Sequence, residues 1–238
     1  MLTTVRIAGT GAAGGPADGG PAYDADNPSA SGRDRRRPAV AASLPATAPT
    51  RGIQMADRVL FVCHANLCRS PMAEYLARRL LAGGTVAVAS VGTDAVEGLP
   101  MHPYAADLAA EAGDDPTDFR SRRLRPEHLA GATLVLTATR RQRSVCTALA
   151  PAVLHRTFTL RQFGRLAAAA EPPEDLAGDP LRAAVEAAAR ARGRLQPATP
   201  GADDLRDPIG GTTADFRRCA EEIERSIRPL AALIGAAG

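Results

Sequence analysis

A short apolar segment that leads into a cysteine, and from there into a helix, constrains this chain most. Residues 59–62 read Val-Leu-Phe-Val and end at Cys63, which is the pattern of a buried parallel strand. Pro71 then begins a helical pattern that runs to Leu81. Proline is tolerated in the first turn of a helix, because the N–H that it lacks has no helical partner there. The segment therefore predicts a strand, a short loop and a helix in direct succession.

The remainder of the chain continues this alternation of strands and helices. We expect further strands over 86–91, 134–136 and 156–159, and further helices over 104–112, 141–149 and 213–233. Strands that alternate with helices form right-handed βαβ units and a parallel sheet. The predicted fold class is therefore α/β, with a four-stranded parallel sheet flanked by helices on both faces.

Two segments differ from this pattern. Residues 1–54 are rich in Gly, Ala, Pro and Asp and carry no apolar period, so we predict a disordered tail before a domain over 55–238. Residues 171–201 are interpreted as a helical insertion, in which Asp179 caps a helix that Pro180 begins. The apolar face of this helix is thin, so we expect it to pack loosely.

The amino-acid composition limits the kinds of binding partner and the cellular compartment that we expect for this chain. A hydrophobic content of 45% supports a core, and a net charge of +3 does not indicate a nucleic-acid partner. Four cysteines in a chain of 238 residues do not make a disulfide framework. No apolar run reaches about 18 residues and no signal peptide is recognisable, so we expect no membrane span and a cytoplasmic location.

The junction between the first strand and the first helix carries the chemical signal. Five residues separate Cys63 from Arg69, at a point where free backbone N–H groups and the positive end of a helix dipole favour an anion. The planar guanidinium of Arg69 can hold two phosphate oxygens, and the same field favours the thiolate of Cys63 as a nucleophile. The residues expected to form the phosphate cup are His64, Ala65, Asn66, Leu67, Cys68 and Ser70.

This segment resembles the phosphate loop of the low-molecular-weight protein-tyrosine-phosphatase family. The likeness consists of Cys-x5-Arg-Ser-Pro after an apolar strand, and it extends to Asn66, Cys68 and Glu74. The resemblance implies a phosphatase that hydrolyses phosphate monoesters through a phosphocysteine intermediate on Cys63, with Arg69 binding phosphate. We also expect a monomer that needs neither a metal nor an organic cofactor.

The resemblance further implies a general acid from an Asp-Pro pair near the C-terminus. The C-terminal half of the chain has two such pairs, Asp179-Pro180 and Asp207-Pro208. The first is interpreted as a helix cap. The second is followed by Ile209-Gly210-Gly211 and by a helix, which is the family arrangement. We therefore predict Asp207 as the acid, with Pro208 holding its loop in a defined pose.

Other segments are similar to supporting parts of the family. Ser90-Val91-Gly92-Thr93 resembles the family's Ser-Ala-Gly-Thr, and by that resemblance Ser90 supports the loop through a hydrogen bond to Asn66. The segment Ser121–Leu124 matches the part that precedes the third strand. The family usually has glycine at the position of Ala65. Alanine there would cost about 1 kcal/mol or more in a left-handed conformation, and a negative φ would remove this cost.

The substrate is less sharply indicated. The resemblance implies a phosphorylated protein, with phosphotyrosine as the family's substrate, or a small phosphate monoester. However, residues 94–100 and 209–211, which would wall an aromatic ring, contain no aromatic residue. Members that act on phosphoarginine tend to have Thr at the position of Leu67, so Leu67 disfavours that activity.

Three alternatives stay open at this point. Arsenate reductases share the fold and the loop but use a further pair of cysteines, whereas only Cys146 lies in the matching region. A zinc site with Cys63, His64 and Cys68 would need a fourth ligand. A catalytically silent phosphate-binding module is the third alternative. Cys68 itself either fills the loop or, as related enzymes suggest, forms a disulfide with Cys63 under oxidation.

Overall fold

The computed structural model describes residues 57–82, 85–171, 179–197, 199 and 201–236, and the structural statements below concern these residues. All of them belong to the second of two units into which the chain divides, residues 51–238. The predicted tail over 1–54 lies outside the described residues. The predicted insertion over 171–201 is described in part.

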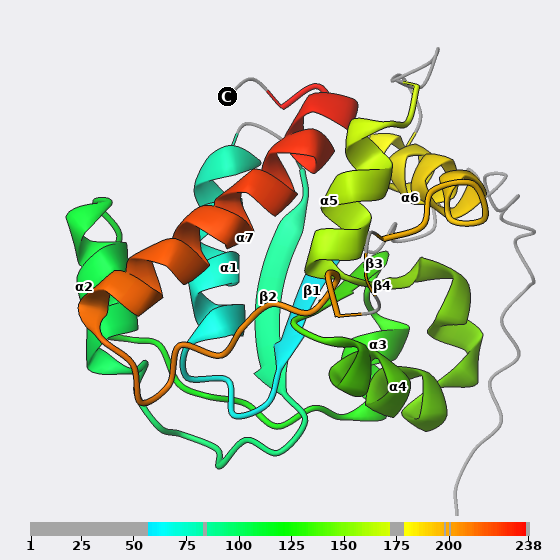
Figure 1. Ribbon diagram of the computed structural model, residues 1–238. Coiled ribbons are helices and arrows are strands. Elements are labelled where there is room, and N and C mark those ends of the chain that lie inside the picture. Colours follow the sequence, from blue (N-terminus) through cyan, green and yellow to red (C-terminus); the bar gives the residue numbers. More distant parts are fainter. Residues whose placement is uncertain (1–56, 83–84, 172–178, 198, 200, 237–238) are drawn as a thin grey trace, which may run out of the picture. The chain divides into compact units, whose positions relative to one another are not determined.

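The sheet has four parallel strands in the order β2-β1-β3-β4 (Figure 1). The strands are β1 (Arg58–Cys63), β2 (Ala87–Gly92), β3 (Leu134–Thr137) and β4 (Thr157–Thr159). β1 is central and pairs with both β2 and β3, so that Cys63 lies opposite Gly92. The predicted α/β fold with a four-stranded parallel sheet is confirmed.

Helices cover both faces of the sheet. They are α1 (Arg69–Leu80), α2 (Pro103–Glu111), α3 (Pro126–Ala130), α4 (Arg140–Leu149), α5 (Leu160–Ala168), α6 (Pro180–Ala191) and α7 (Thr213–Leu233), with a 3₁₀ segment over Pro151–Arg156. α7 lies alongside both α1 and α5 (Figure 1). None of the helices in the described part of the chain is both long and apolar enough to cross a membrane.

The alternation of side chains along β1 explains why the core forms two apolar clusters, one on each face of the sheet. Val59 and Phe61 belong to a large apolar cluster with α1, α5, α6 and α7. Leu60 and Val62 belong to a second cluster, which includes Cys146 of α4. Because successive side chains of a strand point to opposite faces, an unbroken apolar run is needed where both faces are covered.

The expectation that the inserted helix packs loosely is wrong. In α6, Leu181, Ala184 and Ala188 are fully buried. The alanines that make its apolar face look thin leave little bulk between backbones, so the helix can approach its neighbours closely. Arg192, just beyond α6, donates to the carbonyl oxygen of Thr157 on the edge strand β4 at 2.9 Å. The segment thus also supplies a hydrogen-bond donor to a backbone carbonyl at the edge of the sheet.

Candidate active site

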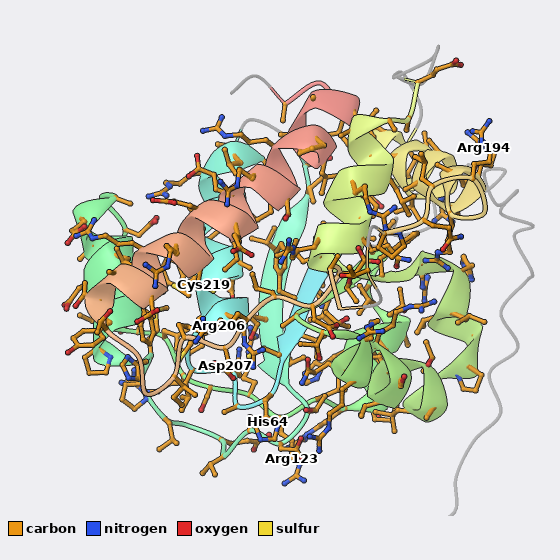
Figure 2. The ribbon with its side chains drawn as sticks, viewed as in Figure 1. His64, Arg123, Arg194, Arg206, Asp207 and Cys219 are labelled. Atoms are coloured by element: carbon orange, nitrogen blue, oxygen red, sulfur yellow. The ribbon has the colours of Figure 1, made fainter. Side chains whose placement is uncertain are left out.

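The site is built at the carboxyl end of β1, where the chain passes into α1. β1 ends at Cys63, and α1 begins at Arg69 with Cys68 as its N-cap residue. Cys63 is 2% exposed. Figure 2 shows His64 and Asp207 at the same end of the sheet, which is the end toward which the strands point. Residues from distant parts of the sequence therefore meet around one thiol.

The thiol of Cys63 receives two hydrogen bonds. The backbone N–H of Asn66 lies 3.3 Å from its sulfur, and the hydroxyl of Ser70 lies 3.0 Å from it. Donors of this kind favour an ionised sulfur. Asn66 has a φ of 56°, and asparagine tolerates this left-handed conformation better than most residues. Positive φ thus occurs at Asn66 and not at Ala65, so the alanine does not carry the cost of a left-handed conformation.

A network of buried side chains holds Asn66 in place. Its amide nitrogen donates to the hydroxyls of Ser70 and Ser90, both at 2.9 Å. Its amide oxygen accepts from the backbone N–H of Arg122 at 2.8 Å. The predicted hydrogen bond between Ser90 and Asn66 is therefore present. Ser90 in turn donates to Glu74 at 2.6 Å.

The segment that follows β2 clamps the loop from outside. The N–H of Thr93 donates to the carbonyl of Cys63, and the N–H of Asp94 donates to that of His64, both at 3.0 Å. Gly92 makes this approach possible, because a Cβ atom there would lie 2.4 Å from the carbonyl oxygen of His64 and 2.7 Å from the nitrogen of Asn66.

Arg69 and Asp207 come together at the cup. The guanidinium of Arg69 is buried, donates to the carbonyl of Leu205 at 3.3 Å and forms an ion pair with Asp207. Pro208 is buried, whereas the Asp207 side chain is 38% exposed. The Asp179-Pro180 pair has the structural role expected for it, since the Asp179 side chain caps α6 by accepting a hydrogen bond from the N–H of Arg182.

Two carboxylates anchor the segment that leads to Asp207, and the sequence analysis did not identify them. Asp203 accepts two hydrogen bonds from Arg165, at 3.0 and 3.1 Å, and Asp204 is ion-paired with Arg140. No local signal distinguishes these aspartates from solvated ones, because their partners come from α5 and α4. Glu74 was recognised only as part of the loop motif, and its contact with Ser90 was not predicted.

The other cup residues differ in exposure. His64 is exposed and lies 2.9 Å from Asp94, whose pKa is lowered first by the hydrogen bond from Thr93 and also by His64. Leu67 packs partly against the core. Cys68 is buried, which raises the pKa of its thiol to about 12, and the nearby Asp207 and Cys63 add to the rise.

The structure also bears on the cysteine and zinc alternatives. Cys146 is fully buried on α4, and burial raises the pKa of its thiol to about 12, as for a core residue. Within the ranges that the structure describes, no group of three or more His, Cys, Asp or Glu side chains is arranged to hold a metal ion.

The fold and the site together define a class. A parallel α/β sheet that brings together a cysteine, an arginine six residues later and a remote aspartate at one anion cup is the arrangement of a cysteine-dependent phosphatase. The family model of the low molecular weight phosphotyrosine protein phosphatases matches residues 58–190. The chain belongs to this family and is a phosphatase.

Individual relatives agree with the family assignment. A protein-arginine-phosphatase from Geobacillus stearothermophilus is 35% identical over 178 residues, which cover 74% of this chain and 95% of the relative. The low molecular weight protein-tyrosine-phosphatase Etp from Escherichia coli K12 is 36% identical over 110 residues, covering 45% of this chain and 71% of the relative.

Solved structures give the same answer for the fold. The arginine phosphatase from G. stearothermophilus superposes with a TM-score of 0.55 at 31% identity, covering 74% of this chain and 91% of its own. A low molecular weight protein tyrosine phosphatase from T. tengcongensis superposes with a TM-score of 0.54 at 29% identity, covering 73% and 97%.

Proposed function

We propose that this phosphatase acts on phosphorylated side chains of proteins, with Cys63 as nucleophile, Arg69 as phosphate ligand and Asp207 as general acid. The observation that carries the proposal is the environment of the Cys63 sulfur. It has two donors within 3.3 Å and lies in a loop closed by Arg69, which is paired with Asp207.

The reaction would proceed in two steps. In the first, the thiolate of Cys63 attacks phosphorus, the S–P bond forms, the ester P–O bond breaks, and the departing oxygen takes a proton from Asp207. In the second, Asp207 accepts a proton from water as the water attacks phosphorus. The S–P bond then breaks, which releases inorganic phosphate and restores the thiolate. Arg69 and the loop N–H groups hold the equatorial oxygens throughout.

Phosphotyrosine is the substrate class that the family description supports. Phosphoarginine is a second candidate, because the similarity to the G. stearothermophilus protein-arginine-phosphatase extends over 95% of that protein. Leu67 argues against the second candidate, since its side chain offers no hydroxyl to a guanidinium. The exposed side chains of Val96, Leu99 and Ile209, in the loops that follow Gly92 and Asp207, are aliphatic and favour neither ring stacking nor ionic recognition.

A substrate panel tests the proposal. Phosphotyrosine, phosphoarginine and phosphoserine peptides and sugar phosphates are compared on the full chain and on Cys63→Ser. We expect hydrolysis of the phosphotyrosine peptide and no turnover by Cys63→Ser, which should still bind phosphate or vanadate. Preference for phosphoarginine would support the second candidate. Phosphate binding without any hydrolysis would indicate a silent binding module, and arsenate reduction with a thiol donor would indicate a reductase.

We also propose that the protein works as a cytoplasmic monomer without a cofactor. The four cysteines are free thiols, and a thiolate nucleophile needs a reducing compartment to stay active. The two-step reaction consumes only the phosphate ester and water. The division of the chain into a tail over 1–54 and a phosphatase domain over 55–238 is part of the same proposal.

A further inference from the structure

Glu74 is a buried carboxylate that the proposed reaction does not use. It lies on α1 and is 2% exposed. One carboxylate oxygen accepts from the hydroxyl of Ser90 at 2.6 Å and lies 3.7 Å from the guanidinium of Arg122, and the other oxygen accepts from Arg78. These donors compensate the cost of burying the charge. Glu74 contacts the loop through Ser90.

The directions of the hydrogen bonds around Glu74 follow from which groups can donate. A backbone N–H only donates, so the bond from Arg122 fixes the amide oxygen of Asn66 as an acceptor and turns the amide nitrogen toward the two serines. That nitrogen carries two hydrogens and donates one each to Ser70 and Ser90. The single hydroxyl hydrogen of Ser90 is then directed to Glu74.

The same reasoning extends to the sulfur. Ser70 accepts from Asn66, so its own hydrogen is available to the sulfur of Cys63 at 3.0 Å or to the carbonyl oxygen of Val91 at 3.2 Å. A charged acceptor makes the stronger hydrogen bond. Once the sulfur is ionised, Ser70 therefore donates to it.

We propose that Glu74 is a positioning residue for the reaction: by accepting the hydrogen of Ser90, it fixes the direction of the hydrogen bonds that end at Cys63. The inference rests on the proposed role of Cys63 as nucleophile. Without an acceptor at position 74, the buried hydroxyl of Ser90 either keeps an unpaired hydrogen or turns it toward the amide hydrogens of Asn66. Both outcomes weaken the hold on Asn66 and, through it, the donation from Ser70 to the sulfur.

The direction in which substitution of Glu74 shifts the pH of Cys63 ionisation distinguishes a positioning role from a purely electrostatic one. Removing a negative charge near a thiol favours the thiolate, so a purely electrostatic role predicts that Cys63 ionises at lower pH after substitution. Loss of a directed donor predicts ionisation at higher pH. The charged groups in contact with Glu74 are Arg78 on its own helix and Arg122 from the segment before α3, and both are retained in the variants below.

The test measures the rate at which iodoacetamide alkylates Cys63 as a function of pH, with the modified residue identified by mass spectrometry of the full chain. Glu74→Met removes the acceptor at similar size. We expect its alkylation midpoint to rise by about one pH unit, the size expected for weakening a hydrogen bond to a charged group. Its kcat/KM on p-nitrophenyl phosphate near pH 7 should fall about tenfold. A midpoint at or below that of the wild type overturns the proposal.

Two further variants complete the design. Glu74→Gln keeps an acceptor oxygen without the charge, and its midpoint should lie at or below that of the wild type. A rise equal to that of Glu74→Met would overturn the role of the acceptor. Glu224→Met is the matched control, because Glu224 forms the same i,i+4 pair with Arg228 that Glu74 forms with Arg78. Its midpoint should not change.

Ser90→Ala carries the test should Glu74→Met not fold. This substitution removes the hydroxyl that connects Glu74 to Asn66 without removing a charge. An unchanged alkylation midpoint of Cys63 would therefore overturn the proposal, and a higher midpoint would support it. Alkylation requires no turnover. A protein that hydrolyses no phosphate ester would refute the proposed function while the midpoints still report on Glu74. A wild type that hydrolyses esters, with midpoints insensitive to Glu74→Met, would refute the positioning role alone.

Discussion

The guanidinium of Arg69 is ion-paired with the carboxylate of Asp207, although 138 positions separate the two residues in the sequence. A phosphate dianion bound in the cup would compete with Asp207 for this guanidinium. Substrate binding would then free the carboxyl group next to the leaving oxygen, where a general acid is needed. Phosphate binding to Arg69 would thus change the position of the Asp207 carboxyl group.

We expect Asp207→Asn to reduce kcat by about 100-fold or more for alkyl phosphates, because general acid catalysis typically contributes at least that much. The loss should be smaller for p-nitrophenyl phosphate, whose leaving group needs little protonation. Vanadate should bind as tightly as to the wild type or more tightly, since the competing carboxylate is gone. Asp179→Asn alters the Asp-Pro pair that caps α6 and should leave kcat and the affinity for vanadate unchanged. Equal kinetic losses in both variants would contradict the assignment of Asp207.

The four thiols should differ in reactivity. Burial raises the pKa of Cys68, Cys146 and Cys219 to about 12, so near pH 7 these side chains are protonated thiols and poor nucleophiles. Their thiolates become populated only as the pH approaches the raised pKa. Brief alkylation near pH 7, followed by peptide mapping, should therefore modify Cys63 alone. Modification of Cys68 at a comparable rate would contradict this prediction.

Gly92 should not tolerate a side chain. A Cβ atom there would meet the backbone of His64 at 2.4 Å and that of Asn66 at 2.7 Å, and backbone atoms cannot move aside as a flexible side chain can. We expect Gly92→Ala to lower the free energy of unfolding by about 1–3 kcal/mol, as overpacking does, and to reduce kcat by displacing the loop. Gly193→Ala has open space around its Cβ position and serves as the control.

Much of the fold and the centre of the site could be predicted because their signals are local. The apolar run before Cys63 and the proline at position 71 predicted β1, the loop and α1. α5 was missed because Leu160 follows β4 without an intervening turn, and because Gly164 falls in the middle of the helix. In the fold, Gly164 permits close approach to α7, since a Cβ atom there would lie 2.8 Å from the backbone of Ser226.

The supporting contacts of the site could not be predicted from local patterns. Asp203, Asp204 and Glu74 are ordinary carboxylates in the sequence, and only the fold brings arginines from other elements to them. Hydrogen-bond direction around Asn66 likewise depends on the backbone of Arg122, 56 residues away. The motif predicts which residues would contact a phosphate, whereas the residues that hold the motif come from long-range packing.

The helix α6 packs closely against the core, although its apolar face is thin in the sequence. Leu181 is fully buried between α6 and the core, whereas Leu154 is 53% exposed. Leu181→Ala should lower the free energy of unfolding by about 2–5 kcal/mol, the usual cost of truncating a buried leucine. Leu154→Ala makes the same chemical change at the surface and should cost about 0.5 kcal/mol or less. Urea unfolding followed by circular dichroism measures both. Equal small losses would mean that α6 packs loosely in solution, as its thin apolar face first suggested.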